Sequence, residues 1–545
     1  MAKIQTIDAK IVDIENCEIY PGRIFFDTHI RKIEHLEKAP DVYILPGLVD
    51  AHVHIESSML PPSEFARLAV RHGTLAAVSD PHEIANVSGI PGIEFMLADA
   101  ARVPFRFLFG APSCVPATPF EETGATITSG DIDKLFQTGK VGYLSEMMNF
   151  PGVVQHDSEV LAKIAVARKY GKPVDGHAPG LSGDALCEYV QAGITTDHEC
   201  SSLEEAEEKI GLGVKILIRE GSAAKNFDAL FPLIEKYPDK VMLCTDDFHP
   251  DDLLRGHING FLARGVSKGI DLFSLLRAAT LNPVHHYQID LGLLRQGDSA
   301  DFIVADNLRD FSIRQSYLRG VCIFDRVGEK SVFSASPKTT VIPGSFGAGK
   351  ISKDDISIIA ASDAMKVIRA IDGELLTRQI IYNVKKGAVV NTNVETDILK
   401  LVVLNRYRPA KPAVAFIRGF ALKQGALAST VAHDSHHIIA VGCDDDSIIK
   451  VINHIIDIKG GLAVLYDKNI IDLKLDIVGL MSSAPGEEVA QAYERLNDAA
   501  YAMGCSLTAP FMTLSFMALL VIPELKLSDR GLFDVNRFEP TGLFV

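Results

Sequence analysis

Short apolar runs alternate with longer helix-like patterns from about residue 48 to about residue 287. The runs include GTLAAVSD, FRFLFGAP, VGYLSEMMN, KPVDGHAP, ITTDHE and KVMLCTDD. Between them lie helical patterns such as SEFARLAVRHG, SEVLAKIAVARKYG and FDALFPLIEKYP. A strand followed by a helix, repeated many times, produces a parallel sheet. Because the repeat spans a length close to the roughly 250 residues of a (β/α)8 barrel, we predict a TIM-like barrel of the α/β class over residues 47–289.

Strand-like segments flank the predicted barrel on both sides. KIQTIDAKIVDI and YPGRIFFDTHI precede it, and LRQGDSADFIVAD and IRQSYLRGVCIFDR follow it. Their alternation of apolar and polar residues is typical of half-buried strands. We predict that residues 1–46 and 290–345 pair into one small composite domain, a β-sandwich. Residues 346–545 mix strand and helix patterns and are predicted to form a C-terminal α+β domain.

The charge balance excludes one class of partner. The chain has 54 basic and 70 acidic residues, a formal net charge of −16, and no run of Lys and Arg. A nucleic-acid-binding protein usually carries a basic face or stripe. We therefore expect a small-molecule substrate and no nucleic-acid partner.

The cysteines, the first residues of the chain and one long apolar segment indicate where the protein resides in the cell. The eight cysteines form no CxxC pair, which favours reduced and mostly buried thiols. The start MAKIQTIDAK lacks the basic-then-apolar plan of a signal peptide, so we expect a cytoplasmic protein. The segment SLTAPFMTLSFMALLVIP, residues 506–523, approaches the length that spans a bilayer. Because it contains Pro510 and lacks a flanking basic cluster, we predict a buried core segment and no membrane partner.

Ionisable residues fall where the predicted strands end. They are Asp80, Glu146, His177, His198 and Asp246. Catalytic groups of (β/α)8 barrels lie at the C-terminal ends of the strands. The pattern therefore predicts that these side chains meet at one mouth of the barrel.

The segment GLVDAHVHIESSM adds two histidines to this set. His52 and His54 are two positions apart, so in a strand they point to the same face and can grip one metal ion. An HxH pair alone is a weak signal. Glu146 alone could be a carboxylate at a helix start, and Asp246 alone could be a helix N-cap. Together, four imidazoles and two carboxylates supply enough ligands for two divalent metals, with one carboxylate bridging them.

The order HxH, carboxylate, His, His, Asp on successive strand ends resembles the amidohydrolase superfamily. The segment AATLNPVHHYQIDLGLLRQGDSADFIVAD resembles the stretch by which these enzymes leave the barrel and re-enter the small β domain. More narrowly, VSDPHEIANV, DGHAPGLSG, CTDDFHPDDL and VAHDSHHIIAVG resemble the adenine deaminase family. This resemblance extends over most of the chain, including the C-terminal third that other amidohydrolases lack.

The resemblance implies a ligand set for two metals: His52, His54 and Asp246 for the first, His177 and His198 for the second, and Glu146 as the bridge. Asp247 follows Asp246 directly, and the first of the two is favoured as the ligand. The family implies manganese or iron, with zinc possible for such ligands. The implied reaction is attack of metal-activated hydroxide on the carbon that carries the exocyclic amine of adenine, giving hypoxanthine and ammonia. Asp246 is expected to carry the proton from water to the leaving nitrogen.

Two further groups are candidates for the pocket. His82, Glu83 and Glu56 are expected to recognise the purine ring, although each carboxylate could instead be a solvated loop residue. The cluster His433, Asp434, His436 and His437 is expected to bind another metal or to reach over the barrel mouth. It could equally be a polar turn between strands.

Other functions remain open at the level of sequence. The same metal site could open a cyclic amide or remove an N-acyl group, or the chain could be a non-catalytic metal-binding relative. The zinc nucleobase deaminases of a different fold are excluded, because they need P-C-x-x-C as well as H-x-E, and the chain has no CxxC. A homo-oligomer, most simply a dimer, is expected for a large enzyme.

Overall fold

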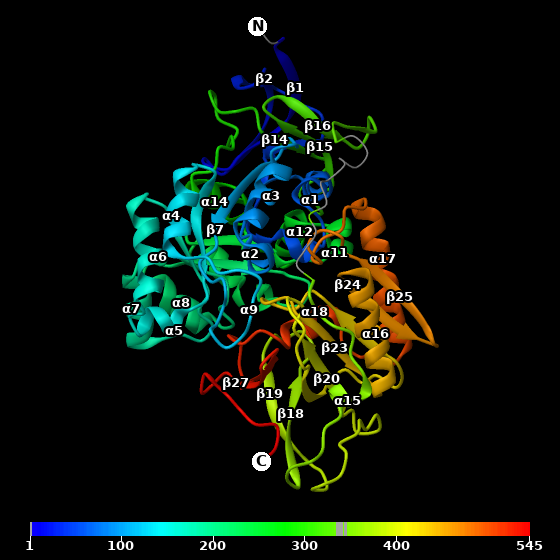
Figure 1. Cartoon of the computed structure of the whole chain (residues 1–545). Helices are drawn as coiled ribbons and strands as arrows, with labels where there is room; N and C mark the ends of the chain where they lie inside the picture. The colour runs from blue at the N-terminus through cyan, green and yellow to red at the C-terminus, as the bar shows by residue number, and fades with distance from the viewer. Residues whose placement is uncertain (1–2, 334–341, 343–345) are drawn as a thin grey trace.

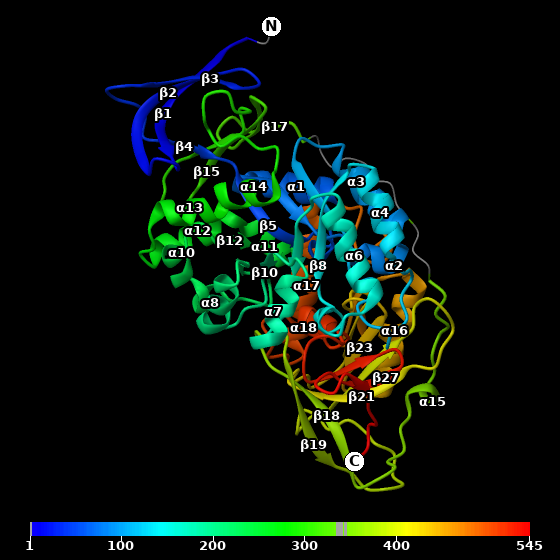
Figure 2. The same cartoon turned by 90° about the vertical axis from the view of Figure 1, so that its left-hand side faces the viewer.

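The computed structural model describes residues 3–333, 342 and 346–545. The end of the predicted small domain, residues 334–341 and 343–345, and the first two residues of the chain lie outside this description. Figure 1 shows a sheet near the N-terminus, a central body of strands and helices, and a C-terminal part at the opposite end. Figure 2 gives the same order after a 90° turn, so the central body lies between the other two parts.

Strands from both flanks of the central body build one sheet. Its order is β17-β16-β15-β14-β4-β1-β2-β3, and the flanks meet where β14 pairs antiparallel with β4. Hydrogen bonding connects all the strands into one continuous sheet, and this sheet folds over itself as the predicted sandwich requires. Phe26 of β2 and Phe302 of β14 lie three places apart in the strand order, yet their ring centroids are 5.1 Å apart in a shared core. The strands are β1 Gln5–Asp13, β2 Glu18–Phe26, β3 Ile30–His35, β4 Tyr43–Pro46, β14 Phe302–Ala305, β15 Ile313–Leu318, β16 Val321–Asp325 and β17 Lys330–Ser331.

The central body is a parallel barrel, as predicted. Strands β5 to β9 pair in sequence order, and β10 to β12 continue in the same direction. The Thr195 amide donates to the Val174 carbonyl at 2.8 Å between these two groups. Strand β13 follows β12 and pairs with β5, which closes the circle. The strands are β5 Leu48–His54, β6 Thr74–Ser79, β7 Arg106–Ala111, β8 Val141–Met147, β9 Val174–Gly176, β10 Thr196–Asp197, β11 Lys215–Arg219, β12 Val241–Cys244 and β13 Asp246–Asp247.

Helices cover the outside of the barrel. The three helical patterns recognised in the sequence form α1, α6 and the pair α9–α10. Side-chain caps start several of them; the Asp157 carboxylate, for example, accepts the first free amides of α6. The helices are α1 Pro62–Ala69, α2 His82–Ser88, α3 Ile90–Ala100, α4 Ser129–Gln137, α5 Phe150–Val154, α6 Ser158–Lys169, α7 Gly183–Gln191, α8 Leu203–Gly211, α9 Phe227–Leu230, α10 Pro232–Lys236, α11 Pro250–Arg255, α12 Ile258–Ser267, α13 Leu272–Ala279 and α14 Leu281–Tyr287.

The C-terminal part is a mixed sheet with the order β19-β18-β21-β20-β23-β22-β24-β25. Both faces are buried: Ala428 packs in a core with α16, whereas its neighbour Leu427 joins the core that includes the barrel. The strands are β18 Ala364–Ala370, β19 Thr377–Asn383, β20 Leu399–Leu404, β21 Ala413–Arg418, β22 Ala426–Ser429, β23 Ile438–Gly442, β24 Gly461–Tyr466 and β25 Asn469–Lys474, followed by the small sheet β26 Leu525–Ser528, β27 Gly531–Asp534 and β28 Glu539–Pro540. The helices are α15 Lys353–Ile356, α16 Asp445–Ile458, α17 Gly486–Ala502 and α18 Pro510–Phe516.

The long apolar segment near the C-terminus is a buried core segment, as predicted. It forms α18 and the turns that follow, and its apolar side chains are buried in the main core. Among the described residues, no helix combines the length and the apolar character needed to cross a membrane. The eight cysteines are all free thiols, and five of them are buried.

Candidate active site

Strand β5 brings the HxH pair to the barrel mouth. Its seven residues are all buried, and because side chains alternate along a strand, His52 and His54 point the same way. Their Nε2 atoms lie 3.2 Å apart. Asp246 Oδ1 lies 3.2 Å from His54 Nε2 and 3.6 Å from His52 Nε2. Three potential ligand atoms from two neighbouring strands therefore converge on one point.

The backbone at Asp246, the first residue of β13, is unusual. Its φ is 60°, in the left-handed region that Asp tolerates better than most residues. The next residue, Asp247, turns its Oδ1 to the Ser57 hydroxyl at 2.5 Å. The geometry therefore favours Asp246 over Asp247 as the partner of the HxH pair.

A second group forms around Glu146 at the end of β8. His177 Nδ1 and His198 Nε2 lie 3.3 Å apart, and Glu146 Oε2 is 2.7 Å from the first and 3.1 Å from the second. The other oxygen, Oε1, lies 3.3 Å from His54 Nε2, so this carboxylate reaches both groups. Burial alone would raise the pKa of Glu146, but the imidazoles of His177 and His198 hold the pKa well below its usual range. Glu146 is thus an anion between the two histidine groups.

The donor set fits divalent cations. Within each group, imidazole nitrogens and carboxylate oxygens lie within 4.8 Å of one another. Two imidazole nitrogens that face each other compete for the same protons, whereas a cation between them satisfies both lone pairs. Imidazole and carboxylate ligands suit manganese, iron and zinc. The residues present therefore fit the binding of divalent cations.

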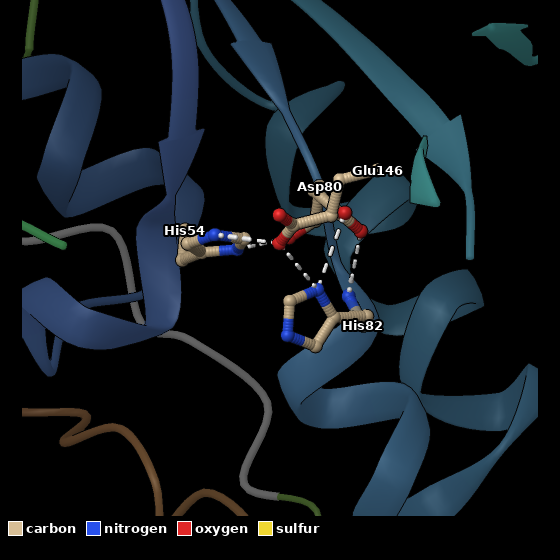
Figure 3. A group of neighbouring side chains, drawn as sticks. All are labelled: His54, Asp80, His82 and Glu146. Atoms are coloured by element: carbon tan, nitrogen blue, oxygen red, sulfur yellow. Dashed lines mark hydrogen bonds and ion pairs between the residues drawn. The ribbon is translucent and has the colours of Figure 1, made fainter. Parts of the chain in front are cut away.

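Asp80 and His82 join this cluster from the end of β6 and the start of α2. Figure 3 shows them beside His54 and Glu146. His82 Nδ1 lies 3.2 Å from Asp80 Oδ2 and 3.5 Å from Glu146 Oε1. Sequence reasoning placed His82 with the ring-recognition residues and noted Asp80 only as a strand end. The structure brings both within reach of the metal-ligand groups.

Glu199 and Arg219 are pocket residues that sequence reasoning missed. The Arg219 guanidinium donates to both oxygens of Glu199, at 2.6 and 2.8 Å, and to Asp246 Oδ2 at 2.5 Å. Burial alone would raise the pKa of Asp246, but Arg219 holds it well below its usual range. A signal existed for both residues. Glu199 directly follows His198, and Arg219 ends the apolar run KILIR, which is strand β11.

The AHDSHH cluster lies on the loop between β22 and β23 and reaches the barrel mouth. His433 Nδ1 lies 2.5 Å from Glu83 Oε1, and His436 Nε2 contacts the other oxygen of the same carboxylate. Burial alone would raise the pKa of Glu83, but the two imidazoles hold it well below its usual range. Asp434 Oδ2 lies 3.6 Å from His82 Nε2. The C-terminal domain thus contacts both residues of the barrel's His82–Glu83 pair.

Four candidates from the sequence lie outside the pocket lining: His52, Glu56, His436 and His437. His52 and His436 still contact lining residues, Asp246 and Glu83. His437 turns away from the pocket, and its Nε2 lies 3.4 Å from Asp529 Oδ1. Glu56 Oε1 accepts the Ile84 amide at 3.1 Å. Burial, with Glu83 nearby, raises the pKa of Glu56 to about 7. Glu56 therefore fixes the backbone next to Glu83 and does not line the pocket.

Apolar side chains close the pocket over the metal-ligand groups. The barrel contributes Met148, and the C-terminal domain contributes Leu375, Phe516, Leu519 and Ile522. The cavity has a volume of about 20 Å³. This space holds one or two water molecules, since about 10–15 Å³ of such volume accommodates one. The lining side chains are almost fully buried, so little water reaches them.

Two protein-family models match the chain. Residues 43–351 match the amidohydrolase family, which is more than half of the chain. Residues 374–539 match the adenine deaminase C-terminal domain. Among solved structures, a beta-aspartyl dipeptidase from Fervidobacterium islandicum AW-1 covers 61% of this chain and 99% of its own, with 17% identity and a TM-score of 0.46. The fold and the site define a hydrolase of the amidohydrolase class that uses divalent metal.

Curated relatives narrow the class further. The adenine deaminase of Methanosarcina mazei is 51% identical over 550 residues, which cover 98% of each chain. The adenine deaminase of a Sulfurovum species is 52% identical over 529 residues, or 97% of each chain. The adenine deaminase of Borreliella burgdorferi is 46% identical over 543 residues, or 98% of each chain. The chain belongs to the adenine deaminase family.

Proposed function

We propose that this chain hydrolyses adenine to hypoxanthine and ammonia. The observation that carries the proposal is the convergence of four histidines, Glu146 and Asp246 beneath a pocket that the C-terminal domain closes. That domain matches the one found in adenine deaminases, which argues against cyclic-amide or N-acyl hydrolysis on the same barrel. The full-length relatives named as adenine deaminases support the same choice.

The proposed ligand roles follow the distances. His52, His54 and Asp246 would hold one cation, His177 and His198 the other, and Glu146 would contact both. We propose manganese or iron as the metals, with zinc as the third candidate. Such cations, when bound, lower the pKa of a water molecule from about 15.7 to about 7.

Asp246 is the proposed proton carrier. Its Oδ1 faces the histidine pair, and its Oδ2 is held by Arg219. The guanidinium fixes the orientation of the carboxylate and favours its anionic form, which accepts a proton. Asp246 would take a proton from water and deliver it to the departing nitrogen at C6. The closed apolar wall keeps other water out of the reaction.

Glu83 and His82 are the proposed ring-binding residues. The anionic Glu83 can accept a hydrogen bond from the exocyclic amine of the base. His433 and His436 hold this carboxylate from the C-terminal domain, and Asp434 faces His82. The orientation of the base would thus depend on both domains.

Ammonia release from adenine tests the proposal. Protein reloaded with manganese or ferrous iron would be assayed with adenine, and with adenosine, cytosine and dihydroorotate in parallel. His177→Ala and Asp246→Ala should abolish the release, while His285→Ala, an exposed histidine on α14, should retain it. A metal-loaded protein that releases no ammonia from adenine would refute the function, and turnover of dihydroorotate would redirect it to amide hydrolysis.

The proposal also covers the cellular location and the oligomeric state of the protein. We propose a cytoplasmic enzyme that forms a symmetric dimer, the commonest assembly of large soluble enzymes. Light scattering on the purified protein measures the assembly: twice the chain mass of 59.2 kDa supports the dimer, and a single chain mass contradicts it.

A further inference from the structure

The apolar wall of the pocket comes almost entirely from the C-terminal domain. Leu519 and Ile522 lie in the turns after α18, Phe516 ends that helix, and Leu375 precedes β19. All four side chains are more than nine-tenths buried. Figures 1 and 2 both place α18 between the barrel and the C-terminal sheet. The wall therefore lies opposite the barrel's metal-ligand groups across the cavity.

Hydrogen bonds fix the backbone of this wall. The buried amine of Lys526 donates to the Leu375 carbonyl at 2.8 Å and to the Phe516 carbonyl at 3.0 Å. The Thr377 amide donates to the Pro523 carbonyl at 2.9 Å, directly after Ile522. Burial lowers the pKa of Lys526 to about 7, and the amine donates hydrogen bonds in either protonation state. The wall can therefore yield by side-chain rotation, but its backbone is held on both sides.

The position of the reacting carbon orients the purine toward this wall. C6 of adenine must lie at the metal-ligand groups, beside Asp246. N9 lies on the five-membered ring, at the far side of the bicyclic base from C6. The N9 edge therefore points away from the ligand groups and toward the C-terminal wall.

We propose that this wall, made of Leu375, Phe516, Leu519 and Ile522, is the element that excludes purines substituted at N9. The inference rests on the proposed adenine hydrolysis. Because the cavity is small, wall side chains must already rotate to admit the bare base. A substituent at N9 meets backbone that is fixed by Lys526 and Thr377. One extra carbon against an apolar wall of a binding pocket changes kcat/KM by about 10- to 200-fold.

The test compares adenine with 9-methyladenine on the same metal-loaded protein. The ratio of the two kcat/KM values cancels differences in folded or metal-loaded fraction between variants. We expect the wild type to favour adenine by about 100-fold. In Leu519→Ala and in Ile522→Ala the ratio should fall by about 10-fold, because each truncation opens space at the N9 edge. Leu520→Ala, which truncates a buried neighbour that does not line the pocket, should keep the wild-type ratio.

Thermal shift measures the same preference through binding alone. Adenine should raise the Tm of the wild type and 9-methyladenine should not, whereas both should raise the Tm of the Leu519→Ala and Ile522→Ala proteins. Truncation of a wall residue does not restore the N9–H that 9-methyladenine lacks. If 9-methyladenine binds to the truncated proteins, the size of its methyl group is therefore the cause of its exclusion from the wild type. A wild type that accepts both bases equally, or wall variants that keep the wild-type preference in both assays, would overturn the inference. Absence of adenine turnover together with size-selective binding would refute the proposed reaction and leave the wall's role intact.

Discussion

The barrel and the C-terminal domain both bring histidines to one pocket, but they hold them by different means. The barrel's histidines and their carboxylates stand at the ends of adjacent parallel strands, so the sheet's hydrogen bonds set their distances. His433 and His436 stand on a loop, and their positions depend on contacts with Glu83 of the barrel. The first arrangement is rigid and suits metal binding, whereas the second links two domains.

This difference predicts a division of labour. Groups on strand ends carry the chemistry, and groups from the C-terminal domain determine how the base is held. Loss of a barrel group should therefore abolish turnover or metal binding. Loss of a C-terminal group should weaken turnover while the metals stay in place.

The largest effect is expected for Asp246→Asn. The amide neither carries the proton nor binds a cation as well as the carboxylate does, so kcat/KM for adenine should fall by about 1,000-fold or more. Steady-state kinetics with measurement of bound metal checks this. Asp247→Asn is the matched comparison, because its carboxylate bonds to Ser57 instead of facing the HxH pair. A larger loss in Asp247→Asn would reverse the ligand assignment.

Arg219→Met tests how much the ion pairs of Arg219 contribute to the stability of the protein. Without the guanidinium, the buried carboxylates of Glu199 and Asp246 lose their shared counterion. Breaking a buried pair in this way costs about 3 to 5 kcal/mol of unfolding free energy. Urea unfolding of metal-loaded protein measures it.

Arg319→Met is the control for that prediction. Arg319 pairs with Asp290, and the two side chains are 60% and 75% exposed. Exposed pairs contribute about 1 kcal/mol or less, so this variant should be almost as stable as the wild type. If both substitutions lowered the unfolding free energy equally, the buried ion pairs of Arg219 would contribute no more to stability than an exposed pair.

His433→Asn tests how much the C-terminal domain contributes to turnover through its contact with Glu83. Glu83 loses one of its two imidazole partners, so kcat/KM for adenine should fall by about 10- to 100-fold, the usual effect of losing a partner that orients a site residue. Bound metal should stay at the wild-type level. His454→Asn on α16, where the imidazole pairs with Asp472, should have no effect on turnover. Metal loss in His433→Asn would mean that the loop belongs to the metal site itself.

The smallest effect concerns the contact that joins α17 to the barrel. Glu487 accepts from Arg67 at 2.9 Å and from Arg71 at 2.6 Å. The hydrogen bond from Arg67 lowers the pKa of Glu487 to about 2 from an ordinary value of 4.5. The pair therefore stabilises the fold above about pH 4.5, and this stabilisation is lost as the pH falls toward about 2.

Glu487→Gln measures that contact. Because Glu487 is one-third exposed, the variant should lose about 1 kcal/mol at pH 7. The difference from wild type should shrink between pH 4.5 and pH 3, since the carboxylate of the unfolded chain then binds a proton while the folded one, with its pKa of about 2, does not. Unfolding midpoints at pH 7 and pH 3 check this. A difference that is the same at both values would mean that the Glu487 charge does not support the domain contact.

The extent of sequence-based prediction differs between the same two regions. The two-residue spacing of His52 and His54 predicts a shared face because a strand repeats every two residues. Arg219 lies at a strand end too, but an arginine after an apolar run has many other uses, so its type alone did not mark it. In the AHDSHH cluster, spacing could not separate His433, which contacts Glu83, from His437, which pairs with Asp529.

The sequence by itself determined the barrel, the ionisable side chains at its strand ends and the family, because local periodicity dictates strands and helices and parallel strands must end together. Only the tertiary structure decided that Glu83 meets His433, that Arg219 supports Asp246, and that the apolar wall faces the ligand groups. These contacts join residues far apart in the chain. Their formation depends on how two domains pack, which no local pattern encodes.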